Sequence, residues 1–351
     1  MALLLGLSWL WPTTTPRDPD ADEIIDWHAH TAGIGAHGSG IFLSPAIRES
    51  YKFPIYLNAF DVSEESLQEH GDAQVLARIS AQIERSRLVS KAVILAMDGV
   101  VDDKGQLDRA HTQIYIPNEF LVENLKQFPN LLFGASIHPR RPDALTRLRA
   151  AHANGAVLVK WLPAIMDIDP ADAQYRPFYA LMRCLGLPLL THTGDERSFA
   201  HADDALSDPA RLKLPLKMGV TVIAAHFAVR GERGSVSNFT RLLPLFDRYP
   251  NLLGDISALT QVGRSEHLAR VLSHPALKGR IVYGSDWPLQ FFPLVSPWYQ
   301  WPGVESSKLK AITDEPNAWD RDVLLKSLVG ATKADFTTSP LAIAKSNQHC
   351  E

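Results

Sequence analysis

Histidine and aspartate side chains close several of the short apolar runs in this sequence. The first run ends in His28-Ala-His30, and later runs end in His192, His226 and Asp286. Residues two apart on a strand point to the same face, so His28 and His30 would lie one after the other along one strand. Imidazole nitrogens and carboxylate oxygens are ligands for a borderline divalent cation such as zinc. The pattern predicts a metal site if the fold brings these strand ends together.

Eight such apolar runs must position these side chains, and they cover 23–30, 91–99, 131–139, 156–163, 187–194, 220–227, 251–258 and 279–288. Nearly continuous apolarity is typical of strands buried on both faces, as in a parallel sheet covered by helices. The segments between and after the runs have helical periodicity. They cover 63–86, 118–128, 142–152, 171–185, 203–217, 235–246, 264–273 and 319–328.

Eight strand–helix units predict an α/β fold, a (β/α)8 TIM barrel in which all the strands end at one mouth. An open doubly wound sheet is the alternative, but it needs a glycine-rich phosphate turn that runs into a helix. The glycines of 31–40 are not closely followed by one. Two long connections, 31–61 after strand one and 289–317 after strand eight, are expected either to build the substrate pocket or to be ordinary insertions.

The two ends of the chain fall outside the barrel, which we predict over 23–330. Residues 1–22 are expected to be an extension and linker, because the apolar stretch at 1–12 is shorter than the roughly 20 residues of a membrane span and no basic residue precedes it. Export through this stretch stays open, but we expect a cytoplasmic protein with no membrane span. Residues 331–351 are predicted to be a C-terminal tail.

Composition excludes several classes of protein. Apolar residues make up 46% and charged residues 21% of the chain, which excludes intrinsic disorder. The formal net charge of -4 argues against a nucleic-acid binder, which normally carries a basic excess. Two cysteines, Cys184 and Cys350, are too few for a disulfide framework.

Four short motifs carry a resemblance to a known family. D-W-H-A-H, T-H-T-G, A-A-H-F and Y-G-S-D-W-P, in this order and spacing, resemble the metal-dependent amidohydrolase superfamily. The residues in and around these motifs are most similar to those of its amidohydrolase-related (amidohydrolase 2) branch, which also contains decarboxylases and lactone hydrolases. The resemblance covers roughly residues 23 to 329.

The resemblance implies a role for each motif residue. His28 and His30 match the pair that binds the more buried metal, and His192 matches a further ligand. His226 matches a histidine that binds a second metal or orients the attacking water. Asp286 matches a metal ligand that doubles as the general base.

Lys160, in the fourth apolar run, falls where two-metal relatives carry a carboxylated bridging lysine. A substrate-facing or structural ammonium is the alternative. One or two divalent ions, zinc in the first place, are therefore expected as the cofactor.

The resulting expectation is a metal-dependent hydrolase that cleaves an amide, ester or lactone bond in a small molecule. A one-metal nonoxidative decarboxylase is the alternative, and a non-catalytic, metal-stabilised barrel is a remote one. Barrels of this type often form homodimers, and no feature of the sequence decides this.

Further side chains near strand ends are candidates for substrate binding, and each has a structural alternative. Arginines there could hold a carboxylate through two hydrogen bonds, or form surface salt bridges. Aromatic rings could line a pocket, or pack in the core. The candidates are His138, Arg140, Arg197, Arg230, Trp161 and Trp287. Asp98 and Asp255 are candidates to hydrogen-bond a ligand histidine from behind.

Overall fold

The computed structural model describes residues 23–288, 295–301 and 303–350. The predicted extension at 1–22 and part of the connection after strand eight, 289–294, lie outside these residues. No helix in the described ranges is both long and apolar enough to cross a lipid bilayer.

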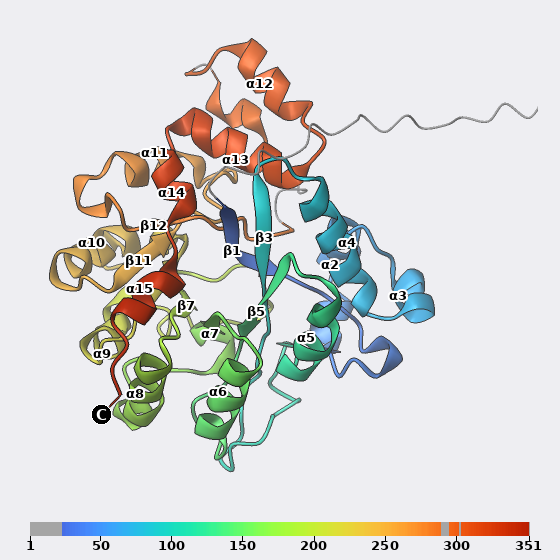
Figure 1. The fold of residues 1–351 in the computed structure, drawn as a ribbon, viewed down its shortest axis with the longest axis vertical. Helices are drawn as coiled ribbons and strands as arrows, with labels where there is room; N and C mark the ends of the chain where they lie inside the picture. Colours follow the sequence, from blue (N-terminus) through green and yellow to red (C-terminus); the bar gives the residue numbers. More distant parts are fainter. Residues whose placement is uncertain (1–22, 289–294, 302, 351) are drawn as a thin grey trace, which may run out of the picture.

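Eight parallel strands form one sheet in the order β1-β3-β5-β6-β7-β8-β11-β12 (Figure 1). Their bounds are β1 Ile24–His30, β3 Val89–Leu95, β5 Leu131–Ala135, β6 Leu158–Trp161, β7 Leu189–His192, β8 Val222–Ala225, β11 Leu252–Asp255 and β12 Ile281–Val282. All eight predicted strands are present, and the prediction of a TIM barrel is confirmed.

Backbone hydrogen bonds between β1 and the segment after β12 close the barrel. The N–H of Trp27 donates to the carbonyl of Tyr283 at 3.1 Å, and the N–H of Asp286 donates to the carbonyl of His28 at 2.8 Å. His30 N–H donates to Trp287 in the same way, at 3.1 Å. The first and last strands are therefore neighbours, as the (β/α)8 topology requires.

Helices surround the strands (Figure 1). Their bounds are α1 Pro45–Arg48, α2 Lys52–Ala59, α3 Glu64–His70, α4 Ala73–Arg85, α5 Asn118–Asn124, α6 Ala144–Ala153, α7 Pro163–Met166, α8 Arg176–Leu185, α9 Lys213–Lys217, α10 Asn238–Arg248, α11 Ser265–Ser273, α12 Ser306–Thr313, α13 Ala318–Val329, α14 Lys333–Thr337 and α15 Pro340–Ser346. Two short antiparallel pairs join β2 Phe42–Leu43 to β4 Ile114–Tyr115 and β9 Glu232–Arg233 to β10 Val236–Ser237. The connection over 31–61 is thus largely structured.

The single helix predicted over 63–86 is wrong, because Gly71 divides it into α3 and α4 with a φ of 81°. A side chain at this position would also meet the ring of His37. The next residue, Asp72, is buried and accepts hydrogen bonds from the backbone N–H groups of Ile34 and Gly35, both at 2.9 Å. The break between α3 and α4 therefore places Asp72 where its carboxylate fixes the backbone of the connection after β1.

The helix predicted over 203–217 is also shorter than expected. A 3-10 turn over Pro209–Leu212 precedes α9 at Lys213–Lys217. The carboxylates of Asp203 and Asp208 accept hydrogen bonds from the backbone N–H groups of Ala205 and Ala210, two residues further on. Such local bonds compete with helix formation, which explains the late start of α9.

The C-terminal residues close the amino end of the barrel. Leu341 and Ile343 of α15 pack against the apolar cluster inside the barrel, which includes Leu158, Leu190 and Val282. Leu158 begins β6, and Leu190 lies two residues before the end of β7, so α15 lies at the end of the barrel opposite to the predicted site. The two cysteines, too few for a framework, form one disulfide, Cys184–Cys350, which ties the C-terminal segment to α8.

Candidate metal centre

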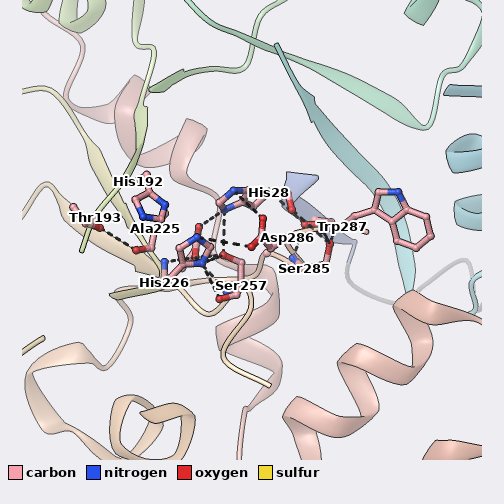
Figure 2. A network of polar contacts seen from close by, with 12 residues as sticks. His28, His192, Thr193, Ala225, His226, Ser257, Ser285, Asp286 and Trp287 are labelled. Atoms are coloured by element: carbon pink, nitrogen blue, oxygen red, sulfur yellow. Dashed lines mark hydrogen bonds and ion pairs between the residues drawn. The ribbon is translucent and has the colours of Figure 1, made fainter. Parts of the chain in front are cut away.

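The carboxylate of Asp286 lies close to His28 and His226 (Figure 2), and His30 is a third histidine beside it. Its Oδ1 is 3.0 Å from Nε2 of His30 and 3.6 Å from Nε2 of His28. Its Oδ2 is 3.9 Å from Nε2 of His226. The end of β1 and the segment after β8 thus place histidines around a carboxylate that follows β12.

Asp255, at the end of β11, holds two of these histidines from behind. Its Oδ2 lies 2.8 Å from Nδ1 of His28, and its Oδ1 accepts the backbone N–H of His226 at 2.8 Å. A carboxylate at Nδ1 places the imidazole proton there and leaves the Nε2 lone pair of His28 facing Asp286. The other candidate for this role, Asp98, forms an ion pair with Arg141 instead.

His226 is held by Ser257 and by an unusual backbone. Its Nδ1 is 3.0 Å from the carbonyl oxygen and 2.8 Å from Oγ of Ser257, so Nε2 again faces Asp286. His226, Phe227 and Ala228 all have left-handed φ angles, of 56°, 49° and 51°. Such conformations are costly for non-glycine residues and are concentrated at functional sites.

His192 lies beside His226, with their ring centroids 5.3 Å apart. Its Nδ1 is 3.5 Å from a carboxylate oxygen of Glu196. Its Nε2 is buried and has no hydrogen-bond partner among the described residues, and the same holds for Nδ1 of His30. Buried polar atoms without partners are costly, so these nitrogens indicate that a further group completes the site.

The ammonium of Lys160 reaches into this site from β6. Its side chain is buried, with 1% of the residue exposed, and Nζ is 3.0 Å from Nε2 of His28. Burial lowers the pKa of Lys160 to about 8. The neutral amine, which carboxylation requires, is therefore accessible near neutral pH.

The buried histidines are neutral at pH 7. Burial, reinforced by the charge of Lys160, lowers the pKa of His28 to about 4. Burial also lowers the pKa of His192 and holds the pKa of His226 well below its usual value. Only the neutral imidazole binds a metal, so this environment suits metal ligands.

Two groups of side chains have the geometry to hold a cation. One atom from each of His28, His30 and Asp286, or from each of His28, His226 and Asp255, lies within 4.8 Å of the others. Nitrogen and oxygen donors of this kind, together with the unpartnered Nε2 of His192, fit a divalent metal.

Residues 25–302 match the family model described as amidohydrolase. The chain belongs to the amidohydrolase family. The predicted resemblance is thereby confirmed, and the family together with the donor set supports a divalent metal in this amidohydrolase. A comparison with curated proteins finds no sequence match.

Solved structures similar to this amidohydrolase share its fold at low identity. They include a TIM-barrel protein from Bordetella bronchiseptica, at 16% identity over 88% of this chain and 100% of that one, with a TM-score of 0.53. A protein assigned as 2-pyrone-4,6-dicarboxylic acid hydrolase from Pseudomonas putida matches at 16% identity over 92% and 98%, with a TM-score of 0.53. A 2,6-dihydroxybenzoate decarboxylase from Rhizobium matches at 13% over 93% and 98%, with a TM-score of 0.52.

Three of the candidates for substrate binding lie elsewhere in the amidohydrolase. Trp161 is fully buried, and its ring lies 5.6 Å from that of Phe178 outside the barrel. Trp287 points away from Asp286 and stacks on Trp319 at 4.0 Å (Figure 2). His138 is also fully buried, and its Nε2 lies 2.9 Å from the carbonyl oxygen of Met166. These positions favour the structural alternative for the three side chains, which is packing for the two tryptophans and a buried hydrogen bond for His138.

The candidate arginines differ in their surroundings. Arg140 forms an ion pair with Asp167 at 2.8 Å, and the exposed Arg197 pairs with Asp195 and Asp204. These two guanidinium groups have carboxylate partners already, which favours the surface salt bridge as their role. Arg230 is partly buried close to the site.

Three residues near the centre were not among the predicted site residues. Glu196 is buried beside His192, four positions after it, a spacing that could have drawn attention to it. Tyr56 of α2 is close enough that burial and the charges of Glu196 and Asp286 raise its pKa. Arg264 is buried in the loop before α11, where the sequence carries no local signal for it.

Proposed function

We propose that this amidohydrolase is a metal-dependent hydrolase that cleaves an amide, ester or lactone bond in a small molecule. One observation carries the proposal: Asp286 lies within 3.0 Å of His30 and 3.6 Å of His28, with its other oxygen toward His226. A carboxylate that touches the metal-binding histidines is placed to accept a proton from a water molecule.

In this proposal His28, His30, His192 and Asp286 hold the divalent cation, zinc in the first place. His226 and a carboxylated Lys160 are the further ligands if a second ion is bound. Such a cation lowers the pKa of a coordinated water from about 15.7 to about 7 and polarises a carbonyl oxygen.

The side chains themselves divide the proton transfers. Burial alone would raise the pKa of Asp286, but the neighbouring His28 and the hydrogen bond from His30 hold it well below its usual value, so the carboxylate is ionised. Asp286 accepts the proton of the attacking water and later donates it to the leaving group. His226, with Nδ1 held by the carbonyl of Ser257, presents the lone pair of Nε2, which can accept a hydrogen bond from the attacking water and orient it.

Nonoxidative decarboxylation is the second candidate. It would use His28, His30, His192 and Asp286 with a single ion. The observation that favours it is the buried Arg264, because a decarboxylase must bind a carboxylate. The remote alternative, a non-catalytic barrel, would be expected to lack an acid–base group, and Asp286 is present.

The test combines metal analysis with two product assays. Protein purified without chelator should contain a divalent metal, and His28→Ala should lose it. A panel of amides, esters and lactones is then assayed for hydrolysis, and a panel of aromatic and unsaturated acids for released carbon dioxide. Absence of metal, or a His28→Ala variant that keeps both metal and activity, would contradict the proposal. About two equivalents of metal that fall to one in Lys160→Ala would support a bridging lysine.

A small-molecule partner, a homodimer and a cytoplasmic location remain proposals. The Cys184–Cys350 disulfide weighs against the cytoplasm, because stable disulfides are rare in that reducing compartment.

A further inference from the structure

The side chain of Arg264 is buried, and two of its nitrogens lack a hydrogen-bond partner within the described part of the chain. The residue is 8% exposed, and neither Nε nor Nη1 has a hydrogen-bond partner among the described residues. Arg264 lies in the loop between β11 and α11, and this loop pairs through Gln261 with Val295 of the connection after strand eight. It is therefore part of the carboxyl-end face of the barrel, which also carries the histidines.

Several charged groups, three of them from the candidate metal centre, act on Arg264. The carboxylates of Asp286, Glu196 and Asp255 are near enough to influence its pKa, but none of them forms an ion pair with it. Arg230 is the strongest charged influence, and it is a second cation. Burial and the charge of Arg230 lower the pKa of Arg264 to about 10, so it still carries its charge at neutral pH.

An arrangement of this kind is costly in the absence of a ligand. A buried charge that lacks hydrogen bonds loses its hydration without compensation. A second positive group close by adds repulsion. A negatively charged group bound between the guanidinium and the metal centre would remove both costs.

We propose that Arg264 binds a carboxylate group of the substrate and thereby orients the reacting part of that substrate toward Asp286. Nε and Nη1, which have no partner among the described residues, each share one edge of the guanidinium with Nη2. Either edge presents two parallel donors, which match the two oxygens of a carboxylate. A singly charged carboxylate suits the place better than a doubly charged phosphate, because three acidic side chains act on the same position. The inference rests on the proposed function only for the role of Asp286.

Binding of benzoate, with benzamide as the neutral analogue of similar shape, tests the inference without turnover. Isothermal titration of the full-length protein, as purified and after chelator treatment, separates the role of the guanidinium from that of any metal. Arg264→Met removes the charge and keeps much of the bulk, and Arg264→Lys keeps the charge without the fork. Arg270→Met is the matched control, because Arg270 is exposed on α11 and lies over the ring of Phe239.

We expect wild type and Arg270→Met to bind benzoate more tightly than benzamide. Arg264→Met should weaken benzoate binding about 10- to 100-fold, as expected for two charge-assisted hydrogen bonds, and leave benzamide unchanged. The affinity of Arg264→Lys for benzoate should lie between those of the wild type and Arg264→Met. The loss should persist after chelator treatment.

Three results would overturn the inference. They are equal affinity of the wild type for benzoate and benzamide, an Arg264→Met variant that binds benzoate as the wild type does, and tighter binding of phenyl phosphate than of benzoate. If Arg264→Met does not fold, as judged by circular dichroism, two other measurements decide whether the inference holds. They are the preference of the wild type for benzoate over benzamide and the affinity of Arg264→Lys for benzoate. Failure of hydrolysis with intact benzoate selectivity would count against the proposed reaction and not against this site.

Discussion

Asp255 and His28 share a hydrogen bond of 2.8 Å that decides which imidazole nitrogen faces Asp286. Since Nδ1 of His28 is engaged with the carboxylate, Nε2 carries the lone pair on the side of the site. The same carboxylate accepts the backbone N–H of His226, so one buried group positions two candidate ligands.

Replacing Asp255 by asparagine should therefore weaken metal binding. We expect a loss of about 10- to 100-fold in metal affinity, because the hydrogen bond to His28 loses its charge. Competition with a chromophoric chelator measures the affinity, and Asp247→Asn, on the exposed face of α10, is the control. Wild-type affinity in Asp255→Asn would show that the bond has no part in holding the ligand.

Asp286→Asn should abolish most of the activity of whichever reaction the product assays identify. The amide has nearly the shape of the carboxylate but cannot accept a proton, so kcat should fall by about 10²- to 10⁴-fold. KM should change much less, because the shape of the pocket is preserved. Steady-state kinetics provide the measurement, and a kcat within tenfold of the wild type would remove Asp286 from the role of general base.

His138 should make the protein less stable in acid. Burial lowers its pKa to about 4, whereas the unfolded chain has the ordinary value of 6.5. Between these values the unfolded state binds more protons, so the free energy of unfolding falls as the pH drops from 6.5 to 4, by about 3 kcal/mol in total. Above pH 6.5 this contribution is fully present.

Urea unfolding at a series of pH values measures this effect. The amide of His138→Gln can still donate to the carbonyl of Met166 but does not titrate, so this variant should show a shallower fall in stability over the same window. Parallel curves for the two proteins would mean that His138 is not responsible.

Reducing the Cys184–Cys350 disulfide should destabilise the protein and leave its chemistry intact. The bond spans 166 positions, and its loss should lower the free energy of unfolding by about 2–4 kcal/mol. Thermal unfolding with and without a reductant measures the change, and a Cys184→Ser/Cys350→Ser double variant should be insensitive to the reductant. Activity should persist at low temperature, because the C-terminal segment packs at the opposite end of the barrel.

The strands could be predicted because buried parallel strands are continuously apolar. The five motif residues could be predicted because polar side chains of metal-binding type stand where these apolar runs end. Alternation along a strand would also have excluded two aromatic candidates. Trp161 follows the inward-facing Lys160 and Trp287 follows Asp286, so alternation predicts that both point away from the interior, as the structure shows. Consistent use of that rule would have placed them in the packing between strands and helices.

Other features depend on contacts that have no local signature. The break at Gly71 serves Asp72, whose partners lie more than thirty positions earlier in the chain. Arg264 has no motif around it, and its significance comes from what surrounds it in space. The pairing of Cys184 with Cys350 likewise requires the C-terminal segment to return beneath the barrel, which composition alone does not indicate.

The seam between β1 and the segment after β12 has a consequence for assembly. His30 and Asp286 are 256 positions apart, and they meet only when the two ends of the sheet join. A metal ion coordinated by both residues would link the first and the last strand of the barrel. The affinity of the protein for that ion would therefore depend on whether the barrel is closed. Cutting or permuting the chain elsewhere should be tolerated as long as this junction can still form.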